Sequence, residues 1–136
     1  MSVSRVSGDR GRCDLLFSRI VRSRGACERC GRPGTDTAHI VGRRFSATRC
    51  AEDNAWCLCR SCHRITGTWA DEFMALADGT IGNDRYEALR RQAEAGIVGQ
   101  TSLMFWRDSL QRLLIRYDEL GIADDWPKVP KTWRKP

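Results

Sequence analysis

The sequence has no hydrophobic run of membrane-spanning length, although a transmembrane helix needs about 20 mostly apolar residues. Its first twelve residues, MSVSRVSGDRGR, are small, polar and basic, which argues against a secretory signal there and predicts disorder over residues 1–11. We therefore expect a chain without membrane attachment that works in the cytoplasm.

Lysine is scarce as well: three lysines stand against 20 arginines, and all three lie in the last nine residues. The net charge is +6 and is unevenly placed, since residues 1–25 hold six arginines against two acids, whereas residues 66–125 hold six against eleven. Positive charge thus gathers in the cysteine-rich half and the C-terminal tail, which indicates a polyanionic partner such as nucleic acid. Arginine suits phosphate recognition, although an arginine-rich proteome would explain the count equally well.

The seven cysteines are an odd number, which does not suit a disulfide framework in a chain without a secretory signal. In a reducing compartment, paired cysteines more often hold a metal. Two Cys-x2-Cys pairs are separated by 28 residues and predict one tetrahedral zinc site, with the ligands Cys27, Cys30, Cys59 and Cys62. Gly31 suits the first turn because it can adopt a positive φ. Cys57 is an alternative to Cys59, but four intervening residues before Cys62 make the poorer turn.

Four thiolates leave no open position on the zinc, so the predicted site is structural and any chemistry must lie beside it. The sequence contains only two histidines, and both fall in this segment. His39 lies between the two cysteine pairs, and His63 follows Cys62 directly. Because of that adjacency, His63 is poorly placed to join the same tetrahedron and is available for another role.

Hydrophobic periodicity and turn residues predict the remaining elements. We expect a helix over residues 13–25, a short strand over 37–41, and helices over 68–79, 83–96 and 102–121, followed by an extended tail with three prolines. The last helix carries an apolar stripe of Leu103, Trp106, Leu110, Leu113, Leu114 and Tyr117, which suits packing onto the domain or onto a second copy of the chain. Trp126 and Trp133 in the tail suit either base stacking or, preferably, docking onto the helices.

His39, Asn54 and His63 follow the order and approximate spacing of the HNH motif, and flanking Cys-x2-Cys pairs are typical of its zinc-bound branch. The stretch AHIVGRRFSATRCAEDNAWCLCRSCHRITG resembles the small HNH endonucleases of phages and prophages. The resemblance covers residues 25–67 and extends through ADEFMALADGTIGNDRYEALRRQAEA to about residue 95.

This resemblance implies an α+β fold, a small zinc-bound ββα-metal core with an N-terminal helix and a C-terminal helical extension. Two antiparallel strands would carry the first histidine and the asparagine loop, and a helix would carry the second histidine. The expected division is a disordered N-terminus (1–11), the HNH domain with its leading helix (12–67), a helical extension (68–122) and an extended basic tail (123–136). The implied activity is hydrolysis of DNA phosphodiester bonds with one Mg²⁺ or Mn²⁺ ion, in phage or mobile-element DNA processing within the host cytoplasm.

The same resemblance implies the residue roles. His39 is the expected general base, His63 a ligand of the divalent ion, and Asn54 the residue that holds the loop and orients His39. The chain departs from the pattern at the residue directly before the base, where many members carry a second metal ligand and this sequence has alanine. Asp36, two residues before that alanine and on its face of the strand, is a weaker candidate ligand.

Arg43 and Arg44, shortly after His39, are the expected contacts to DNA phosphates. Two other functions compete with the endonuclease. One is a catalytically silent zinc module that binds DNA or a partner protein, which Ala38 and the basic clusters favour. The other is a purely structural zinc domain. A zinc-finger transcription factor fits poorly because the Cys2His2 spacing is absent. The expected protein partner is either a second copy of the chain, in a homodimer, or a phage DNA-processing protein.

Overall fold

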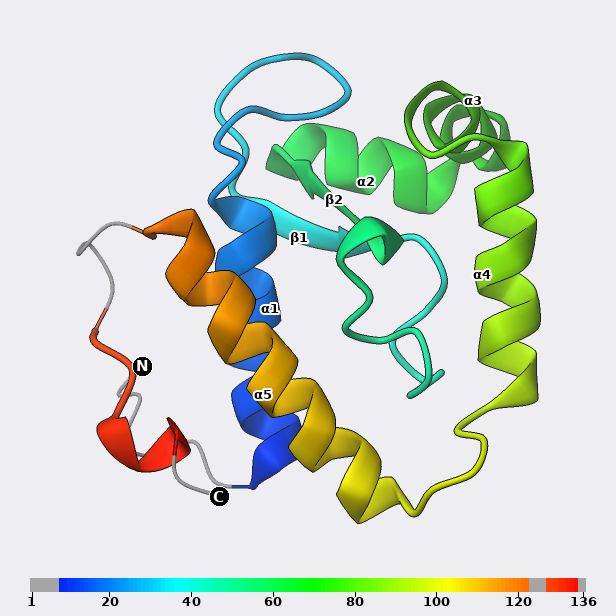
Figure 1. The fold of residues 1–136 in the computed structure, drawn as a ribbon. Helices are drawn as coiled ribbons and strands as arrows, with labels where there is room; N and C mark the ends of the chain where they lie inside the picture. Colours follow the sequence, from blue (N-terminus) through cyan, green and yellow to red (C-terminus); the bar gives the residue numbers. More distant parts are fainter. Residues whose placement is uncertain (1–7, 123–126, 135–136) are drawn as a thin grey trace. The chain divides into compact units, whose positions relative to one another are not determined.

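The computed structural model describes residues 8–122 and 127–134, and the chain divides into two compact units (Figure 1). Residues 1–20 and 99–136 belong to the first unit and residues 21–98 to the second, so the boundary falls in the last turn of helix α1 (Asp9–Arg22). These units cut across our sequence-based division in two respects. Most of the leading helix groups with the C-terminal residues, and the expected extension over 68–122 is split between the units.

The second unit contains a two-stranded antiparallel sheet and three helices. Strands β1 (Asp36–His39) and β2 (Ala55–Leu58) pair in a register that sets Asp36 opposite Leu58 and His39 opposite Ala55. The helices that follow β2 are α2 (Arg60–Thr68), α3 (Ala70–Thr80) and α4 (Asn83–Ala95). This mixture of helices and a small antiparallel sheet confirms the α+β class.

Strand β1 is shorter than the strand predicted over residues 37–41. The reason is that Ile40 and Val41 bond to Asn54 rather than to β2: the Ile40 N–H donates to the Asn54 carbonyl at 2.9 Å, and the Val41 N–H donates to Asn54 Oδ1 at 2.7 Å. Asn54 closes a short 3-10 helix, η2 (Glu52–Asn54), directly before β2.

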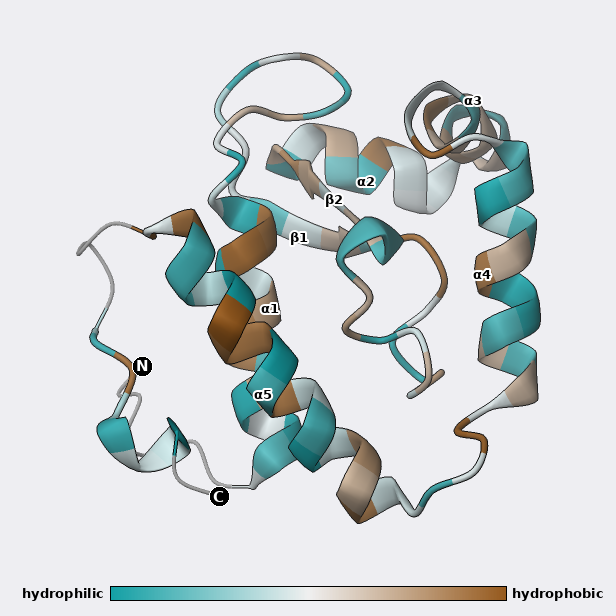
Figure 2. Ribbon diagram, viewed as in Figure 1, coloured by the Kyte–Doolittle hydropathy of each residue, from teal (hydrophilic) through white to brown (hydrophobic). Residues whose placement is uncertain are grey.

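The core of the second unit lies between the sheet and the helices. All four residues of β2 are buried, and the strand stands out as hydrophobic in Figure 2. Trp56 packs edge-on against Phe73 of α3 with ring centroids 5.2 Å apart, and its indole N–H donates to the Thr80 hydroxyl at 2.8 Å. Such a core holds few large side chains, as expected for a unit with two four-residue strands.

The first unit contains most of α1, helix α5 (Ser102–Leu120) and a 3-10 helix, η3 (Lys131–Arg134). Because α1 begins at Asp9, the predicted disorder is wrong for residues 9–11; residues 1–7 lie outside the described part. Four residues of the predicted α5 stripe are buried, namely Trp106, Leu110, Leu113 and Leu114. The expectation was wrong for Leu103, which lies in the first turn of α5 and is 62% exposed.

The C-terminal tail is docked within the first unit. Trp133 is 3% exposed, which confirms the preferred expectation that it packs onto the protein, and Trp126 lies outside the described residues. Arg134 donates two hydrogen bonds to the carboxylate of Asp118 on α5, at 2.7 and 2.9 Å. The extended conformation predicted for the tail is wrong over residues 131–134, which form η3.

Among the described helices, none combines the length and the apolar character that a membrane crossing requires.

Candidate functional site

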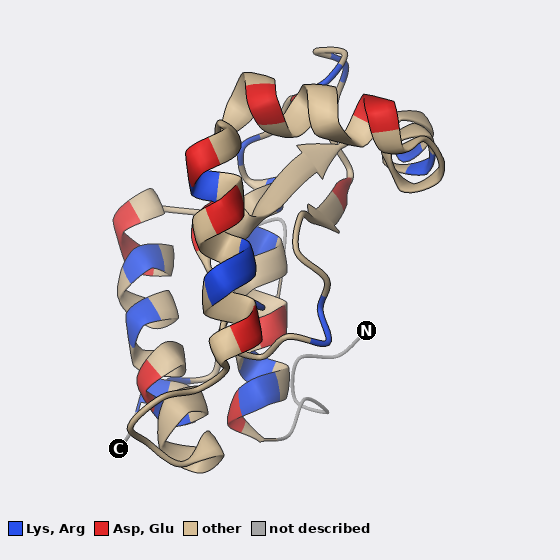
Figure 3. Ribbon diagram, turned by 90° about the vertical axis from the view of Figure 1, so that its right-hand side faces the viewer, with Lys and Arg blue, Asp and Glu red and all other residues tan. Residues whose placement is uncertain are grey.

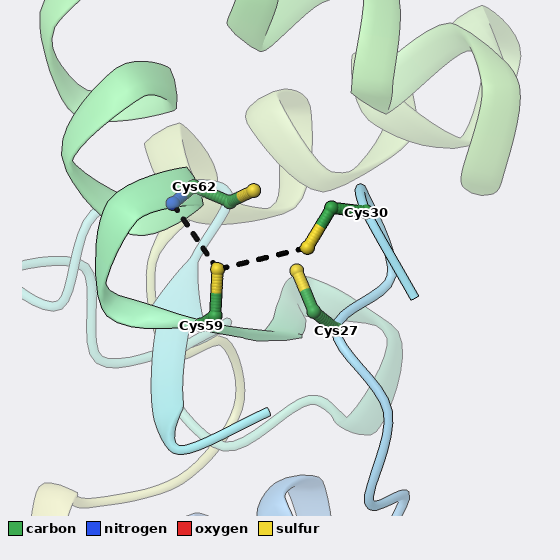
Figure 4. A group of neighbouring side chains, drawn as sticks. All are labelled: Cys27, Cys30, Cys59 and Cys62. Carbon is green, nitrogen blue, oxygen red and sulfur yellow. Dashed lines mark hydrogen bonds between the residues drawn. The ribbon is translucent and has the colours of Figure 1, made fainter. Parts of the chain in front are cut away.

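Four cysteines gather their sulfur atoms at one point of the second unit, as Figure 4 shows. The sulfur atoms of Cys27, Cys30, Cys59 and Cys62 all lie within 4.8 Å of one another. The Sγ atoms of Cys30 and Cys59 are 3.7 Å apart, close to the edge of about 3.8 Å that follows from a tetrahedron with zinc–sulfur bonds of about 2.3 Å. This geometry fits zinc, and the ligand set is the one that the sequence predicted.

Two different local structures present the two cysteine pairs. Cys27 and Cys30 lie in a tight turn closed by the Gly31 N–H, which donates to the Cys27 carbonyl at 2.8 Å; Gly31 has a φ of +79°, as expected. Cys59 is the N-cap residue of α2, and its sulfur accepts a hydrogen bond from the Cys62 N–H at 3.4 Å. A turn and a helix N-terminus are both rich in N–H groups, which suit thiolate ligands.

Cys57 is excluded from the cluster by its position in β2. Its side chain is fully buried and packs against Gly34, where a Cβ atom would stand 2.4 Å from the Cys57 sulfur. Burial raises the pKa of the Cys57 thiol, so it stays protonated near neutral pH. The Cys57 N–H donates to the Glu28 carboxylate at 2.6 Å, and this bond ties the first cysteine turn to β2.

The protonation of the four clustered thiols is unequal. Burial acts to raise the pKa of Cys27, but hydrogen bonds from the backbone of Cys59, Cys30 and Arg29 outweigh it and lower the pKa to about 6. Burial raises the pKa of Cys62 to about 12, against the hydrogen bond that Arg29 donates to its sulfur at 3.5 Å. Thiolates this close repel one another, so the four become fully ionised only around a cation.

A second group of polar side chains joins the start of β1 to the first turn of α2. His63 Nδ1 lies 3.0 Å from Asp36 Oδ2, and Arg60 Nη2 lies 3.8 Å from Asp36 Oδ1. The hydrogen bond from His63 is the main cause that lowers the pKa of Asp36, which is therefore a carboxylate at neutral pH. The side chain of His63 is 44% exposed and that of Asp36 is 16% exposed, so solvent reaches the pair.

A third group organises the loop between the two strands. Asn54 is fully buried, and its side-chain NH2 donates to the Val41 carbonyl at 3.0 Å and to the Thr48 carbonyl at 2.9 Å, while its Oδ1 accepts from the Val41 N–H. His39, the last residue of β1, has Nε2 2.9 Å from the carbonyl oxygen of Arg49 in the same loop. Since a carbonyl only accepts, His39 donates from Nε2. Asn54 thus bonds to the same loop whose Arg49 carbonyl accepts from His39.

The structure thus brings Asp36 and His63 together and sets His39 in a different hydrogen-bonded group. His39 is three residues beyond Asp36 in the same strand, which corresponds to about 10 Å between their Cα atoms. Alternation along the strand directs the two side chains to opposite faces of β1. Ala38, between them, is 4% exposed and belongs to the core beneath α2, so it contributes nothing to a polar site.

The arginines expected to bind phosphate lie in the loop after β1. Arg43 and Arg44 are both exposed, and the Arg44 guanidinium lies over the Phe45 ring, 4.7 Å from its centroid. Arg44 and Phe45 also line a small pocket of about 230 Å³ with Arg90 of α4. Along α4 itself, acidic and basic residues are interleaved, as Figure 3 shows. The surface of α4 is therefore not uniformly positive.

Two arginines that sequence reasoning did not single out support these groups. Arg29, inside the first cysteine turn, donates one hydrogen bond to the Cys62 sulfur at 3.5 Å and another to the Glu72 carboxylate on α3 at 3.0 Å. Arg49 is 7% exposed, donates to the Arg43 carbonyl at 3.2 Å and provides the carbonyl that binds His39. The position of Arg29 between Cys27 and Cys30 is a signal that the sequence contains, whereas nothing in its sequence position separates Arg49 from the other arginines.

No family model, no curated protein and no solved structure matches this chain.

Proposed function

We propose that this chain is a zinc-stabilised DNA endonuclease of the HNH type, which hydrolyses phosphodiester bonds with one divalent ion held by Asp36 and His63. The observation that carries the proposal is the 3.0 Å contact between His63 Nδ1 and Asp36 Oδ2 beside the four-cysteine cluster. The contact supports Asp36 as the oxygen ligand, in place of the residue directly before His39, which is alanine in this chain. The order of β1, β2 and α2, with a histidine on the first strand and another on the helix, agrees with the family resemblance.

The donor set of this pair fits a small divalent ion. Two neighbouring ligands of an octahedral ion at about 2.1 Å lie about 3.0 Å apart, which is the separation of Asp36 Oδ2 and His63 Nδ1. His63 would bind the ion in the tautomer protonated at Nε2, so the ion takes the place of the proton that Nδ1 donates to Asp36. Asp36 is ionised at neutral pH, and solvent access allows water to complete the coordination. When bound, Mg²⁺ or Mn²⁺ stabilises negative charge that develops on the phosphate during hydrolysis.

His39 is the proposed general base. Because it donates from Nε2 to the Arg49 carbonyl, its neutral ring has the unshared electron pair on Nδ1, where it takes a proton from the attacking water. Asn54 acts through the loop rather than on the substrate. The proposal requires the substrate to lie across the edge of β1 that pairs with no strand in the described residues, with Asp36 on one face of the strand and His39 on the other.

Arg43 and Arg44 are the proposed contacts to the DNA backbone. Both are exposed in the loop that directly follows His39 at the end of β1. Guanidinium groups bind phosphate oxygens in pairs and add affinity without reading base sequence. The substrate class is therefore DNA bound through its backbone.

A plasmid-nicking assay with Mg²⁺ and with Mn²⁺ tests the proposal. We expect the wild type to nick supercoiled DNA, and His39→Ala and Asp36→Ala each to lower the rate by about 100-fold or more. Arg91→Ala, which removes one exposed positive charge from α4, is the matched control and should cleave at the wild-type rate. The proposal is wrong if wild type and both site variants leave the plasmid equally intact with either ion.

The second candidate is a catalytically silent module that binds DNA or a protein partner through the same surface. The burial of Ala38 and the contact of Asp36 with both His63 and Arg60 favour it, since these polar groups already satisfy one another. This candidate predicts DNA affinity that falls steeply with salt and no cleavage with any ion. Measuring binding to a short duplex between about 50 and 200 mM salt, beside the nicking assay, separates the two candidates.

A further inference from the structure

A pocket of about 440 Å³ lies within the first unit, at the start of α1 and beside α5 and η3. Its lining includes two arginines, Arg12 of α1 and Arg107 of α5, together with Gln111, Thr132 and Trp133. All of these residues belong to one unit, so the pocket exists whatever the arrangement of the two units. Neither the cysteine cluster nor the histidine groups contribute to it.

Arg12 has a buried polar atom that no described residue satisfies. Its Nε is buried and has no hydrogen-bond partner in the described part of the chain. Its guanidinium lies over the ring of Trp133, 5.4 Å from the centroid, and Trp133 is 3% exposed. This cation–π contact uses the face of the ring and provides no hydrogen-bond acceptor for the Nε–H. A buried donor without an acceptor costs about 1–3 kcal/mol, so such groups indicate an absent partner.

Arg107 provides a second positive charge without a partner. Within the described residues, the guanidinium of Arg107 has no hydrogen bond and no ion pair, and the side chain is exposed at the pocket. Asp9, at the start of α1, is the one acidic residue of the lining, so the two arginines leave a net positive charge. Gln111 and Thr132 add neutral groups that can donate hydrogen bonds.

We infer that this pocket binds a phosphate group. Arg12 and Arg107 line the pocket from α1 and α5, and a guanidinium group is a fork of N–H donors that binds two oxygens of one oxyanion. The phosphate has two possible sources, the backbone of a nucleic acid or a free nucleotide. The inference is independent of the endonuclease proposal, because it uses no residue of that site.

Isothermal titration calorimetry of the full chain tests the inference with three probes: inorganic phosphate, dAMP and a 12-nucleotide single strand. We expect saturable binding, with Arg107→Ala and Arg12→Met each raising Kd about tenfold or more, since hydrogen bonds to charged groups are worth about 1.5–3 kcal/mol. Arg91→Ala removes the same charge from α4 and should leave Kd within about twofold. Binding of dAMP as tight as that of the strand identifies a nucleotide, and binding of the strand alone identifies the backbone.

The inference is overturned if none of the probes binds saturably, or if Arg107→Ala binds as the wild type does. Arg12→Met keeps an unbranched side chain over Trp133, and far-UV circular dichroism checks its fold. Should that variant lose its structure, Arg107→Ala decides alone, because Arg107 is exposed and without partners among the described residues.

Discussion

The second unit builds its core around two four-residue strands and four clustered cysteines, whereas the first buries long apolar side chains of two helices. In the first unit, Leu16 and Phe17 of α1 and Leu110 and Leu114 of α5 are each at most 3% exposed. In the larger cluster of the second unit, four of the seven buried residues are cysteine or alanine, beside Ile40, Trp56 and Leu58. We infer that metal coordination stabilises the second unit, while apolar burial suffices for the first.

The largest expected effect is loss of the metal site. Cys30→Ser removes one exposed ligand without opening a cavity, so its effect isolates coordination from packing. We expect loss of zinc and of amide protection in β1, β2 and α2, because structural zinc contributes on the order of 10 kcal/mol to such folds. Native mass spectrometry counts the zinc, and hydrogen exchange measures the protection.

Cys50→Ser is the matched control, because Cys50 lies outside the cluster. It should keep one zinc per chain and the wild-type exchange pattern. If Cys30→Ser also keeps its zinc and its protection, the contrast between the two units is wrong.

In the first unit, truncation of a buried leucine is expected to have the next largest effect. Leu114→Ala should lower the free energy of unfolding by about 2–5 kcal/mol, because it leaves a cavity in α5's buried face. Leu103→Ala, on the same helix but 62% exposed, should change it by less than about 0.5 kcal/mol. Urea unfolding monitored by circular dichroism measures both variants, and equal effects would show that the buried stripe does not stabilise this unit.

Removing the Asn54 amide should weaken the second unit by a smaller amount. Asn54→Ala leaves the buried Val41 N–H without its acceptor and removes the donor to the Thr48 carbonyl, which costs about 1–3 kcal/mol. Asn83→Ala, at the exposed start of α4, is the control and should stay near the wild type. Urea unfolding measures the free energy of unfolding of both variants. In Asn54→Ala, we also expect the Val41 amide hydrogen to exchange faster than in the wild type.

The smallest effect concerns a pair that joins α4 to η2. Arg85 forms a bidentate ion pair with Asp53, and this hydrogen bond is the main cause that lowers the pKa of Asp53 below its usual value of 3.8. The pair therefore stabilises the fold above about pH 4, and this contribution is lost as the pH falls through the lowered pKa.

In Arg85→Ala, the pKa of Asp53 should rise toward 3.8. Carboxyl carbon chemical shifts in an NMR titration measure it, with Asp78 of α3 as an internal reference that should not move. An unchanged Asp53 titration would contradict the assigned cause.

The cysteine cluster was predictable from sequence because its signal is local: two Cys-x2-Cys spacings, with Gly31 after the first, indicate which sulfurs can meet. The partner of His63 was less predictable, since Asp36 reaches it only through the register of β1 against β2 and the start of α2. Arg49 could not be found from sequence at all, because its part in the site is a backbone carbonyl that every residue has.

The division into units also escaped sequence reasoning. The periodicity of α1 and α5 correctly predicts two amphipathic helices, but periodicity does not indicate which elements pack together. The contacts that join them connect residues 98 and 93 positions apart, namely Arg19 with Tyr117 and Cys13 with Trp106. Composition and linker signals reflect only neighbours in the chain, so they placed the boundary at residue 67 instead.

The ion that we propose between Asp36 and His63 can be measured directly, because the chain has only two histidines. In NMR spectra of the imidazole groups, substoichiometric Mn²⁺ should broaden the ring signals of His63 before those of His39, and Asp36→Asn should abolish the effect. If the His63 signals do not broaden, or if they broaden equally in Asp36→Asn, Asp36 and His63 do not hold the ion together.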